Sequence, residues 1–321
     1  RIVAHTWATG TGRIVIWPNW AVPALLKLMR AKQAFVSAAG AKQRIAERTI
    51  RPRSFAPPVR LRPNVDISME RVGNWPVYTV VPAGAASTDV RGSVVYVHGG
   101  GWVNEIVGQH WQLIAQIAVE TRTTVVVPIY PLIPFGNARQ VCDGVIDLAL
   151  RAEQAHGTVA LAGDSAGGQI VLSAAFELRD RGVIPAHMTL ISPALDLTWS
   201  NPRIPDVQPT DPWLAVPGGK VLAEAWRGEL PLTDPAVSPL FGDFSGLGPI
   251  DVYTGVRDVL NPDAHLLIER AVAAGVDITL HEREGQVHVY PLLPTAVGRA
   301  ARREITATLR DALRGAHQRA E

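Results

Sequence analysis

A chain of 321 residues, of which 47% are hydrophobic and 19% charged, is long enough to bury the core of one large α/β domain with insertions. Its aromatic content argues against a disordered chain, and its formal net charge of +2 is close to neutral. The single cysteine, Cys142, excludes an intrachain disulfide, and the apolar run around it predicts a buried structural thiol rather than a nucleophile.

Charge and hydropathy also limit the partners of the chain. Basic residues are frequent in the first sixty positions, but they lack a nucleic-acid-binding fold signature and interleaved aromatic side chains, so we expect a solvated helix face and no nucleic-acid partner. No apolar run reaches the roughly 18 residues of a membrane span, and residues 1–17 lack the order of a signal peptide. We therefore expect a soluble, cytoplasmic protein without stable membrane insertion, and we leave a homodimer open.

The first sixty or so residues predict helices followed by a linker. Between residues 18 and 50, apolar residues recur at steps of three and four, which predicts a helical segment. Four prolines between residues 51 and 63 then indicate a linker. We expect residues 1–61 to form N-terminal helices and a linker, and residues 62–321 to form the main α/β domain.

Strands and helices alternate from residue 65 onward. The runs 67–72 and 77–81, joined by Gly73-Asn74, predict a β-hairpin. Short β-branched runs predict further strands at 94–97, 125–129, 159–162, 188–191, 250–253 and 278–281, and helical patterns lie near 109–121, 138–155, 166–181, 261–274 and 294–315. This alternation predicts an eight-stranded, mostly parallel sheet with helices on both faces.

A glycine run closes the first strand after the hairpin. In His98-Gly99-Gly100-Gly101-Trp102, backbone N–H groups could approach a developing negative charge without side chains in the way. No Gly-Lys-Ser/Thr follows, so a phosphate-binding loop is disfavoured. We expect the N–H groups of Gly100 and Gly101 to contribute to an oxyanion hole.

The most informative motif is Gly163-Asp164-Ser165-Ala166-Gly167, which lies between a short apolar run and a long helical pattern. A serine at such a strand-to-helix turn has its hydroxyl held toward a cleft, and the two glycines allow close backbone approach. The N–H of Ala166, at the positive end of the following helix, would complete the oxyanion hole. We predict that Ser165 is a nucleophile, although an ordinary glycine-rich turn can have the same pattern.

One segment, residues 196–229, does not fit the alternation of strands and helices. It contains five prolines and three tryptophans and is too long for a plain connection, so we expect a cap insertion over the site. We expect Trp102, Trp199 and Trp213 to contact the substrate as apolar walls. The alternative is that these aromatic side chains only pack under a loop.

A nucleophilic serine needs a base and an acid, which in this type of site follow it along the chain. His288 lies in a loop after the last predicted strand, whereas His281 lies inside that strand, so we predict His288 as the base. Asp258 follows the preceding strand and is the predicted acid. Asp263, at the start of the next helix, is its main rival, and Asp251 lies at the wrong end of the strand.

No metal or cofactor site is expected from the remaining motifs. The sequence contains no His-Glu-x-x-His and no Cys-x-x-Cys pair, so it gives a metal site little support. Gly10-Thr11-Gly12 lacks the third glycine and the preceding strand of a dinucleotide-binding site.

As a set, these motifs resemble the hormone-sensitive-lipase-like family (family IV) of bacterial carboxylesterases, within the α/β-hydrolase fold. The likeness covers about residues 62–315 and rests on His98 to Trp102, Gly163 to Gly168, Asp258 to Leu260 and His288, in this order. Two departures concern neighbours of the site. Tyr130-Pro-Leu-Ile-Pro-Phe135 lacks the usual glutamate, and His288-Val289-Tyr290 replaces the usual His-Gly-Phe, but neither change removes a catalytic atom.

The resemblance implies an α/β hydrolase whose N-terminal helices and insertion form a helical cap over the catalytic domain. It implies a serine carboxylesterase that hydrolyses short-to-medium acyl esters through Ser165, His288 and Asp258. The chain is also similar to actinobacterial acetyl-hydrolases, so an acetyl-hydrolase or deacetylase, an amidase or a lactone hydrolase acting on a secondary metabolite remains an alternative. A non-catalytic ligand-binding module, as in the plant gibberellin receptors of this superfamily, is less favoured because those receptors lack the histidine that His288 supplies.

Overall fold

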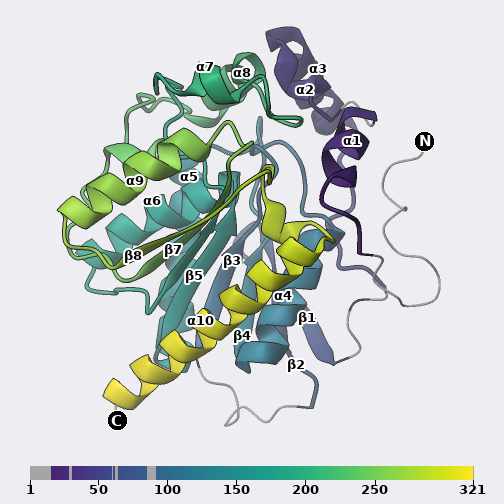
Figure 1. The fold of residues 1–321 in the computed structure, drawn as a ribbon. Coiled ribbons are helices and arrows are strands. Elements are labelled where there is room, and N and C mark those ends of the chain that lie inside the picture. Colours follow the sequence, from purple (N-terminus) through teal and green to yellow (C-terminus); the bar gives the residue numbers. More distant parts are fainter. Residues whose placement is uncertain (1–15, 29–30, 60, 62–63, 85–91, 321) are drawn as a thin grey trace.

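The computed structural model describes residues 16–28, 31–59, 61, 64–84 and 92–320, and for residues 317–320 it describes the backbone alone. The expectations for residues 1–15, including the signal-peptide argument and Gly10-Thr11-Gly12, lie outside this range. Within it, eight strands form one sheet in the order β1-β2-β4-β3-β5-β6-β7-β8 (Figure 1). The β1–β2 and β2–β4 pairs are antiparallel and the other pairs are parallel, so the predicted mostly parallel sheet is confirmed.

The predicted strands and the hairpin are all present, with boundaries that differ by a few residues. The strands are β1 (Val65–Val72), β2 (Trp75–Pro82), β3 (Ser93–Val97), β4 (Thr124–Pro128), β5 (Val159–Asp164), β6 (Met188–Ile191), β7 (Ile250–Gly255) and β8 (Ile278–Arg283). The larger helices around the sheet are α4 (Gly108–Thr121), α5 (Ala138–His156), α6 (Ala166–Asp180), α9 (Asn261–Ala273) and α10 (Ala296–Ala320). Short 3₁₀ helices, η2 (Pro239–Phe241) and η3 (Tyr290–Leu292), lie in two of the connections.

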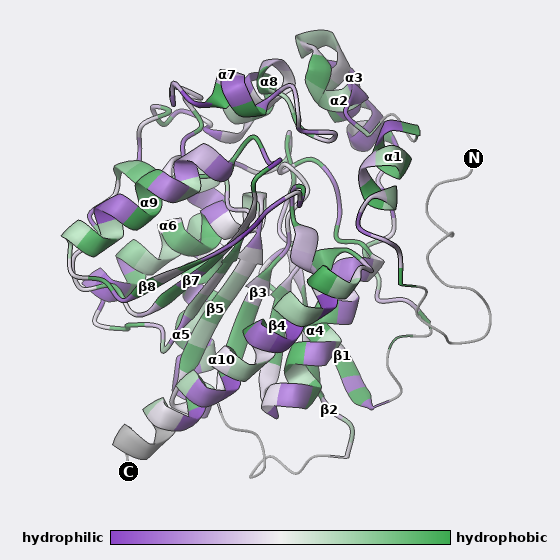
Figure 2. Cartoon of the chain, in the orientation of Figure 1, coloured by the Kyte–Doolittle hydropathy of each residue, from purple (hydrophilic) through white to green (hydrophobic). Residues whose placement is uncertain are grey.

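Helices cover both faces of the sheet and enclose two apolar layers. On one face α4 and α10 pack against each other and against the sheet, and on the other face lie α5, α6 and α9. In Figure 2, β3 is hydrophobic along most of its length, whereas α9 and α10 carry both colours. Removing these apolar faces from water is the main favourable term that holds the three layers together.

The segment 18–50, predicted as helical, contains three helices. These are α1 (Ala21–Leu28), α2 (Gln33–Val36) and α3 (Ala38–Ile50). Ser37 has an extended backbone, with φ of −141° and ψ of 155°, and its side chain accepts a hydrogen bond from the N–H of Gly40. This serine N-cap ends α2 and starts α3.

The insertion also contains helices, namely α7 (Ile204–Val207) and α8 (Val216–Trp226). Both α2 and α3 pack against α8, and Figure 1 shows these helices together beyond one end of the sheet. The division at residue 61 into cap and catalytic domain stays a prediction. None of the helices in the described part of the chain is both long and apolar enough to cross a membrane.

Cys142 lies on the buried face of α5, as the sequence predicts. It is 1% exposed, and burial raises the pKa of its thiol to about 12. Because the thiolate is the reactive form, this cysteine is a packing residue.

Candidate active site

Ser165 occupies a strained turn between β5 and α6. Its φ is 52° and its ψ is −116°, a conformation that L-residues rarely adopt. A Cβ added at Gly167 would lie 1.9 Å from the carbonyl oxygen of Val97, and one at Gly163 would lie 2.6 Å from the backbone of Gly167. Glycine is therefore required at both positions, and the partly exposed Ser165 is held at the carboxyl end of β5 among buried neighbours.

The structure brings Ser165, His288 and Asp258 together. His288 Nε2 lies 3.0 Å from Ser165 Oγ, and His288 Nδ1 lies 2.8 Å from Asp258 Oδ2. Asp258 follows β7 and His288 follows β8, so the ends of parallel strands place all three side chains at one edge of the sheet. Asp258 is 0% and His288 4% exposed, so the charge of this carboxylate is poorly screened by water.

The surroundings of His288 favour a strong base. Burial lowers the pKa of the imidazole, but the charge and hydrogen bond of Asp258, with the charges of Asp211 and Asp164, raise it above its ordinary value overall. A neutral imidazole that donates its Nδ1–H to Asp258 presents the lone pair of Nε2 to the Ser165 hydroxyl. The arrangement can therefore take a proton from the serine.

The rival residues have other contacts. Asp263 accepts a hydrogen bond from Asn201 at 2.8 Å, and burial raises the pKa of its carboxyl to about 7. His281 stacks on Tyr253 at 4.3 Å and lies 3.4 Å from Asp251. No group of His, Cys, Asp and Glu side chains among the described residues is arranged to hold a metal ion.

The glycine loop after β3 lies directly beside Ser165. A Cβ added at Gly99 would lie 3.0 Å from the Cβ of Ser165. Gly100 and Gly101 have φ values of 122° and 62°, which glycine adopts without strain. Their N–H groups and that of Ala166 donate to no other described residue, so they are free to bind an anion.

Asn104 braces this glycine loop and links it to α3. Its side-chain amide donates to the carbonyl oxygen of Gly100 at 2.9 Å. Its Oδ1 accepts from Arg48 Nε at 3.3 Å and from Arg44 at 3.5 Å. Arg48 also lies 3.8 Å from Glu105, so α3 contacts the loop through several polar groups.

The structural role of Asp164 was not predicted from the sequence: its carboxylate binds the backbone of the glycine loop after β3. Its Oδ1 accepts from the Tyr96 hydroxyl at 2.8 Å and from the N–H of Gly99 at 3.0 Å. Its Oδ2 lies 3.1 Å from Nε2 of His110, whose Nδ1 accepts from the N–H of Val107. Burial alone would raise the pKa of Asp164, but these partners, led by His110, hold it below its ordinary value. The one sequence signal was a carboxylate inside a buried apolar run.

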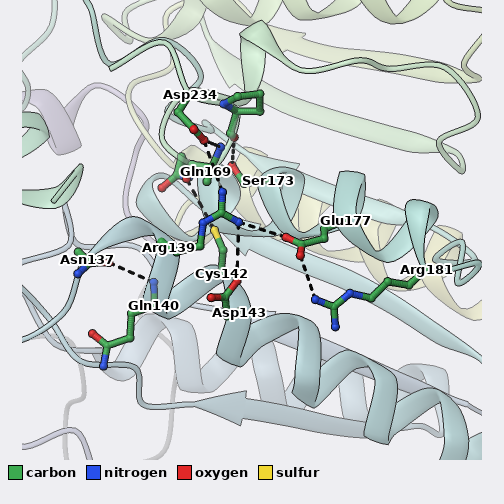
Figure 3. Close-up of polar contacts among 12 residues, drawn as sticks. Asn137, Arg139, Gln140, Cys142, Asp143, Gln169, Ser173, Glu177, Arg181 and Asp234 are labelled. Atoms are coloured by element: carbon green, nitrogen blue, oxygen red, sulfur yellow. Dashed lines mark hydrogen bonds and ion pairs between the residues drawn. The ribbon is translucent and has the colours of Figure 1, made fainter. Parts of the chain in front are cut away.

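Gln169 on α6 is a second supporting residue that the motifs did not indicate. Its Oε1 accepts from the indole N–H groups of Trp102 at 3.1 Å and Trp226 at 2.9 Å. Its Nε2 donates to Ser173 Oγ at 3.0 Å and to the carbonyl oxygen of Ala236 at 2.8 Å, part of the network in Figure 3. Because Trp102 is 4% exposed and stacks on Trp226, its contact with substrate stays a prediction, and the contacts seen here anchor the glycine loop.

The other two predicted substrate-binding tryptophans lie in the insertion. Trp213 meets the imidazole of His288 edge-on, with ring centroids 5.8 Å apart, so it forms a wall beside the candidate base. Trp199 packs against α8, where a Cβ added at Gly219 would lie 2.2 Å from its ring. Direct contact of either with substrate stays a prediction.

Comparison with known proteins places this geometry in a family. A family model described as alpha/beta hydrolase fold matches residues 94–292. The chain is 35% identical to a triacylglycerol lipase of Mycobacterium tuberculosis over 62% of this chain, but the match spans only 42% of that lipase. It is 31% identical to an acetyl-hydrolase of Streptomyces hygroscopicus over 63% of this chain and 70% of that protein.

Solved structures agree with the sequence matches. An esterase from the bacterial hormone-sensitive lipase (HSL) family is 25% identical and superposes with a TM-score of 0.77, covering 94% of this chain and 100% of that one. A crystallised protein from Staphylococcus aureus, 24% identical, shares the fold with a TM-score of 0.79 over 87% of this chain and 95% of that one. The chain therefore belongs to the α/β-hydrolase fold family and, within it, to the hormone-sensitive-lipase-like group of carboxylic ester hydrolases.

Proposed function

We propose that this chain is a serine carboxylesterase that hydrolyses short-to-medium acyl esters of small molecules through an acyl-enzyme intermediate. The observation that carries the proposal is the hydrogen-bonded series from Asp258 through His288 to Ser165, at a partly exposed turn. The free N–H groups beside that turn support it, because acyl transfer needs donors for a developing oxyanion. Relatives named as a triacylglycerol lipase and an acetyl-hydrolase add support, because both names denote hydrolases that release an acyl group.

In the first half of the reaction, Ser165 Oγ attacks the ester carbonyl carbon while His288 Nε2 takes the hydroxyl proton. Asp258 holds the imidazole in the required tautomer and stabilises the imidazolium that forms. The N–H groups of Gly100 and Ala166, with that of Gly101, bind the oxyanion of the tetrahedral intermediate.

The imidazolium then protonates the departing alcohol, and the acyl group remains on Ser165. In the second half, His288 takes a proton from water, which attacks the acyl carbon, and returns that proton to Ser165 Oγ as the carboxylic acid leaves. Besides the ester and water, both halves use only groups of this chain.

The test is hydrolysis of p-nitrophenyl esters from acetate to octanoate, with Ser165→Ala as the control variant. We expect turnover with a burst of p-nitrophenol in the unaltered chain, and a loss of kcat of about 10⁴-fold or more in the variant. A fluorophosphonate probe should label the unaltered chain and leave Ser165→Ala unlabelled. Absence of turnover on every ester of the series would refute the esterase and favour a ligand-binding module.

An acetyl-hydrolase is the second candidate, because the Streptomyces relative carries that name. A pocket that accepts only a two-carbon acyl group would give an abrupt fall in kcat/KM between acetate and butyrate. Matching anilides and lactones, measured in parallel, separate an amidase and a lactone hydrolase from an esterase, since the acyl-transfer groups are common to all three.

A further inference from the structure

A second buried carboxylate, Asp211, lies beside the candidate triad and belongs to the insertion rather than to the sheet. It is 2% exposed. Its Oδ2 accepts the N–H of Val259 at 2.8 Å, and Val259 directly follows Asp258. Its Oδ1 accepts the N–H groups of Trp213 at 2.7 Å and Leu214 at 2.9 Å. In each of these hydrogen bonds a backbone N–H donates and the carboxylate of Asp211 accepts, which suits an ionised carboxylate because it has no proton to donate.

These hydrogen bonds fix two neighbours of His288. On one side Asp211 holds Trp213, whose ring stands edge-on to the imidazole at 5.8 Å. On the other side it holds the backbone next to Asp258, which binds Nδ1 of the same imidazole. One side chain thus sets the position of both the wall and the acid of the candidate base.

Asp211 is itself fixed by the N-terminal segment. Lys32, at the start of α2, donates through Nζ to the carbonyl oxygens of Asp211 at 2.6 Å and Gln208 at 3.0 Å. Gln208 in turn accepts the N–H of Val216 through its side chain, which closes the segment before α8. The backbone of Asp211 is therefore held by the N-terminal segment, while its carboxylate is bonded by Val259 after β7 and by its own segment.

The charges around His288 give Asp211 an electrostatic effect as well. Asp258, Asp211 and Asp164 are the acidic groups that act on the imidazole, and each favours its protonated form. The cations Lys32 and Arg257 lie against the outer backbone of the same segment, where Arg257 donates to the carbonyl oxygen of Thr210. Burial, followed by the charge of Asp258, raises the pKa of Asp211 above its ordinary value, although its three N–H donors act in the opposite direction.

We propose that Asp211 is a positioning residue of the candidate site, which fixes Asp258 and Trp213 on two sides of His288 and stabilises the imidazolium formed during acyl transfer. This inference rests on the proposed triad. The chemistry is unchanged: the proton still moves between Ser165 and His288, and Asp211 takes no part in the proton transfer.

The test compares pH profiles of kcat/KM for p-nitrophenyl acetate. Asp211→Asn removes the charge and leaves one N–H donor without its acceptor, so we expect kcat/KM to fall about 10- to 100-fold, the effect of losing a buried charged hydrogen bond. We also expect the acid limb to move toward lower pH, because the imidazole loses a neighbouring negative charge. Asp211→Glu keeps the charge, so its acid limb should stay at the position of the unaltered chain even if kcat/KM falls.

Asp196→Asn is the matched control. Asp196 is a buried aspartate of the same insertion, and its carboxylate is bonded by Thr198 and Ser200 rather than by the backbone next to Asp258. Its acid limb should not move. If Asp211→Asn does not give a folded protein by circular dichroism, Asp211→Ser, which keeps a hydroxyl acceptor without the charge, should show the same shift.

An acid limb that stays in place in both neutral variants of Asp211 would overturn the electrostatic role, and an unchanged kcat/KM would overturn the positioning role. Failure of the triad itself looks different, since Ser165→Ala would then keep activity in the unaltered background.

Discussion

Replacing Gln169 by leucine tests whether the glycine loop depends on a side chain outside the motifs. Leucine has a similar volume and fills the space on α6, but it can neither accept nor donate a hydrogen bond. Gln169 accepts from Trp102 and Trp226 and donates to the carbonyl oxygen of Ala236. The substitution therefore isolates the polar function of this position.

The expected cost follows from the groups that lose their partner. Two buried groups, the indole N–H groups of Trp102 and Trp226, lose their acceptor, and each is worth roughly 1–3 kcal/mol when left unsatisfied. The carbonyl of Ala236 keeps the thiol of Cys142 as a donor at 3.7 Å, so the free energy of unfolding should fall by about 3 kcal/mol. With an unfolding entropy of about 2.1 cal/mol/K per residue, 321 residues correspond to about 0.67 kcal/mol/K, which turns 3 kcal/mol into a Tm lower by about 4–5 °C.

Activity separates a positioning effect from a loss of stability alone. Trp102 directly follows Gly101, so we expect kcat for p-nitrophenyl butyrate, measured well below the Tm of the variant, to fall about 10-fold or more with little change in KM. Trp226→Phe is the control, because it removes the indole N–H on α8 and leaves the bond between Gln169 and Trp102 in place; it should lower Tm and keep kcat. A Gln169→Leu protein with lower Tm and the kcat of the unaltered chain would refute the reasoning.

Three further outcomes follow from the structure. Gly167→Ala should abolish burst release of p-nitrophenol, since its Cβ would lie 1.9 Å from the carbonyl oxygen of Val97, and a normal burst amplitude would contradict this close approach. Asp263 has a folded-state pKa raised to about 7 by burial, so stability should decline as pH rises from about 4 to about 7, and Asp263→Asn, which still faces Asn201, should flatten the dependence of urea midpoints on pH over that window. Cys142 should react with a thiol reagent at neutral pH only after unfolding, because burial raises its pKa to about 12, and rapid labelling of the native chain would argue against its buried position.

The central strands β3 to β7 could be predicted from the sequence because they are short, almost fully buried apolar runs, most of them with β-branched residues, a pattern set by local composition. The elbow at Ser165 could be predicted for a similar reason, since glycines are needed where backbones approach within contact distance. The acid and the base could be predicted as Asp258 and His288 because both follow the ends of strands, and parallel strands bring their carboxyl ends to the same edge of the sheet as Ser165.

The supporting residues could not be predicted in the same way. Gln169 and Asp211 act through partners 67 and 48 residues away in the chain, and no local pattern specifies such pairings. An aromatic side chain such as Trp102 is typical of a pocket wall, but its indole N–H donates to the buried Gln169 and its ring stacks on Trp226. These partners lie on α6 and α8, and only the packing of these two helices brings them to Trp102. The break at Ser37 was missed because a serine inside a helical pattern also fits a helix interior, and its capping role depends on its extended backbone.

The polar contacts of α2 and α3 have a consequence for chimeras in which these helices are exchanged between related proteins. Arg48 on α3 holds Asn104 beneath the glycine loop, and Lys32 at the start of α2 holds the segment that carries Asp211. A chimera that exchanges these helices with those of a relative would replace Lys32 and Arg48. It would thereby change the contacts to the segment of Asp211 and to Asn104 beside the glycine loop. Exchange of these helices therefore calls for transplanting Lys32 and Arg48 together with their acceptors, because these contacts join the helices to the segments that carry the glycine loop and Asp211.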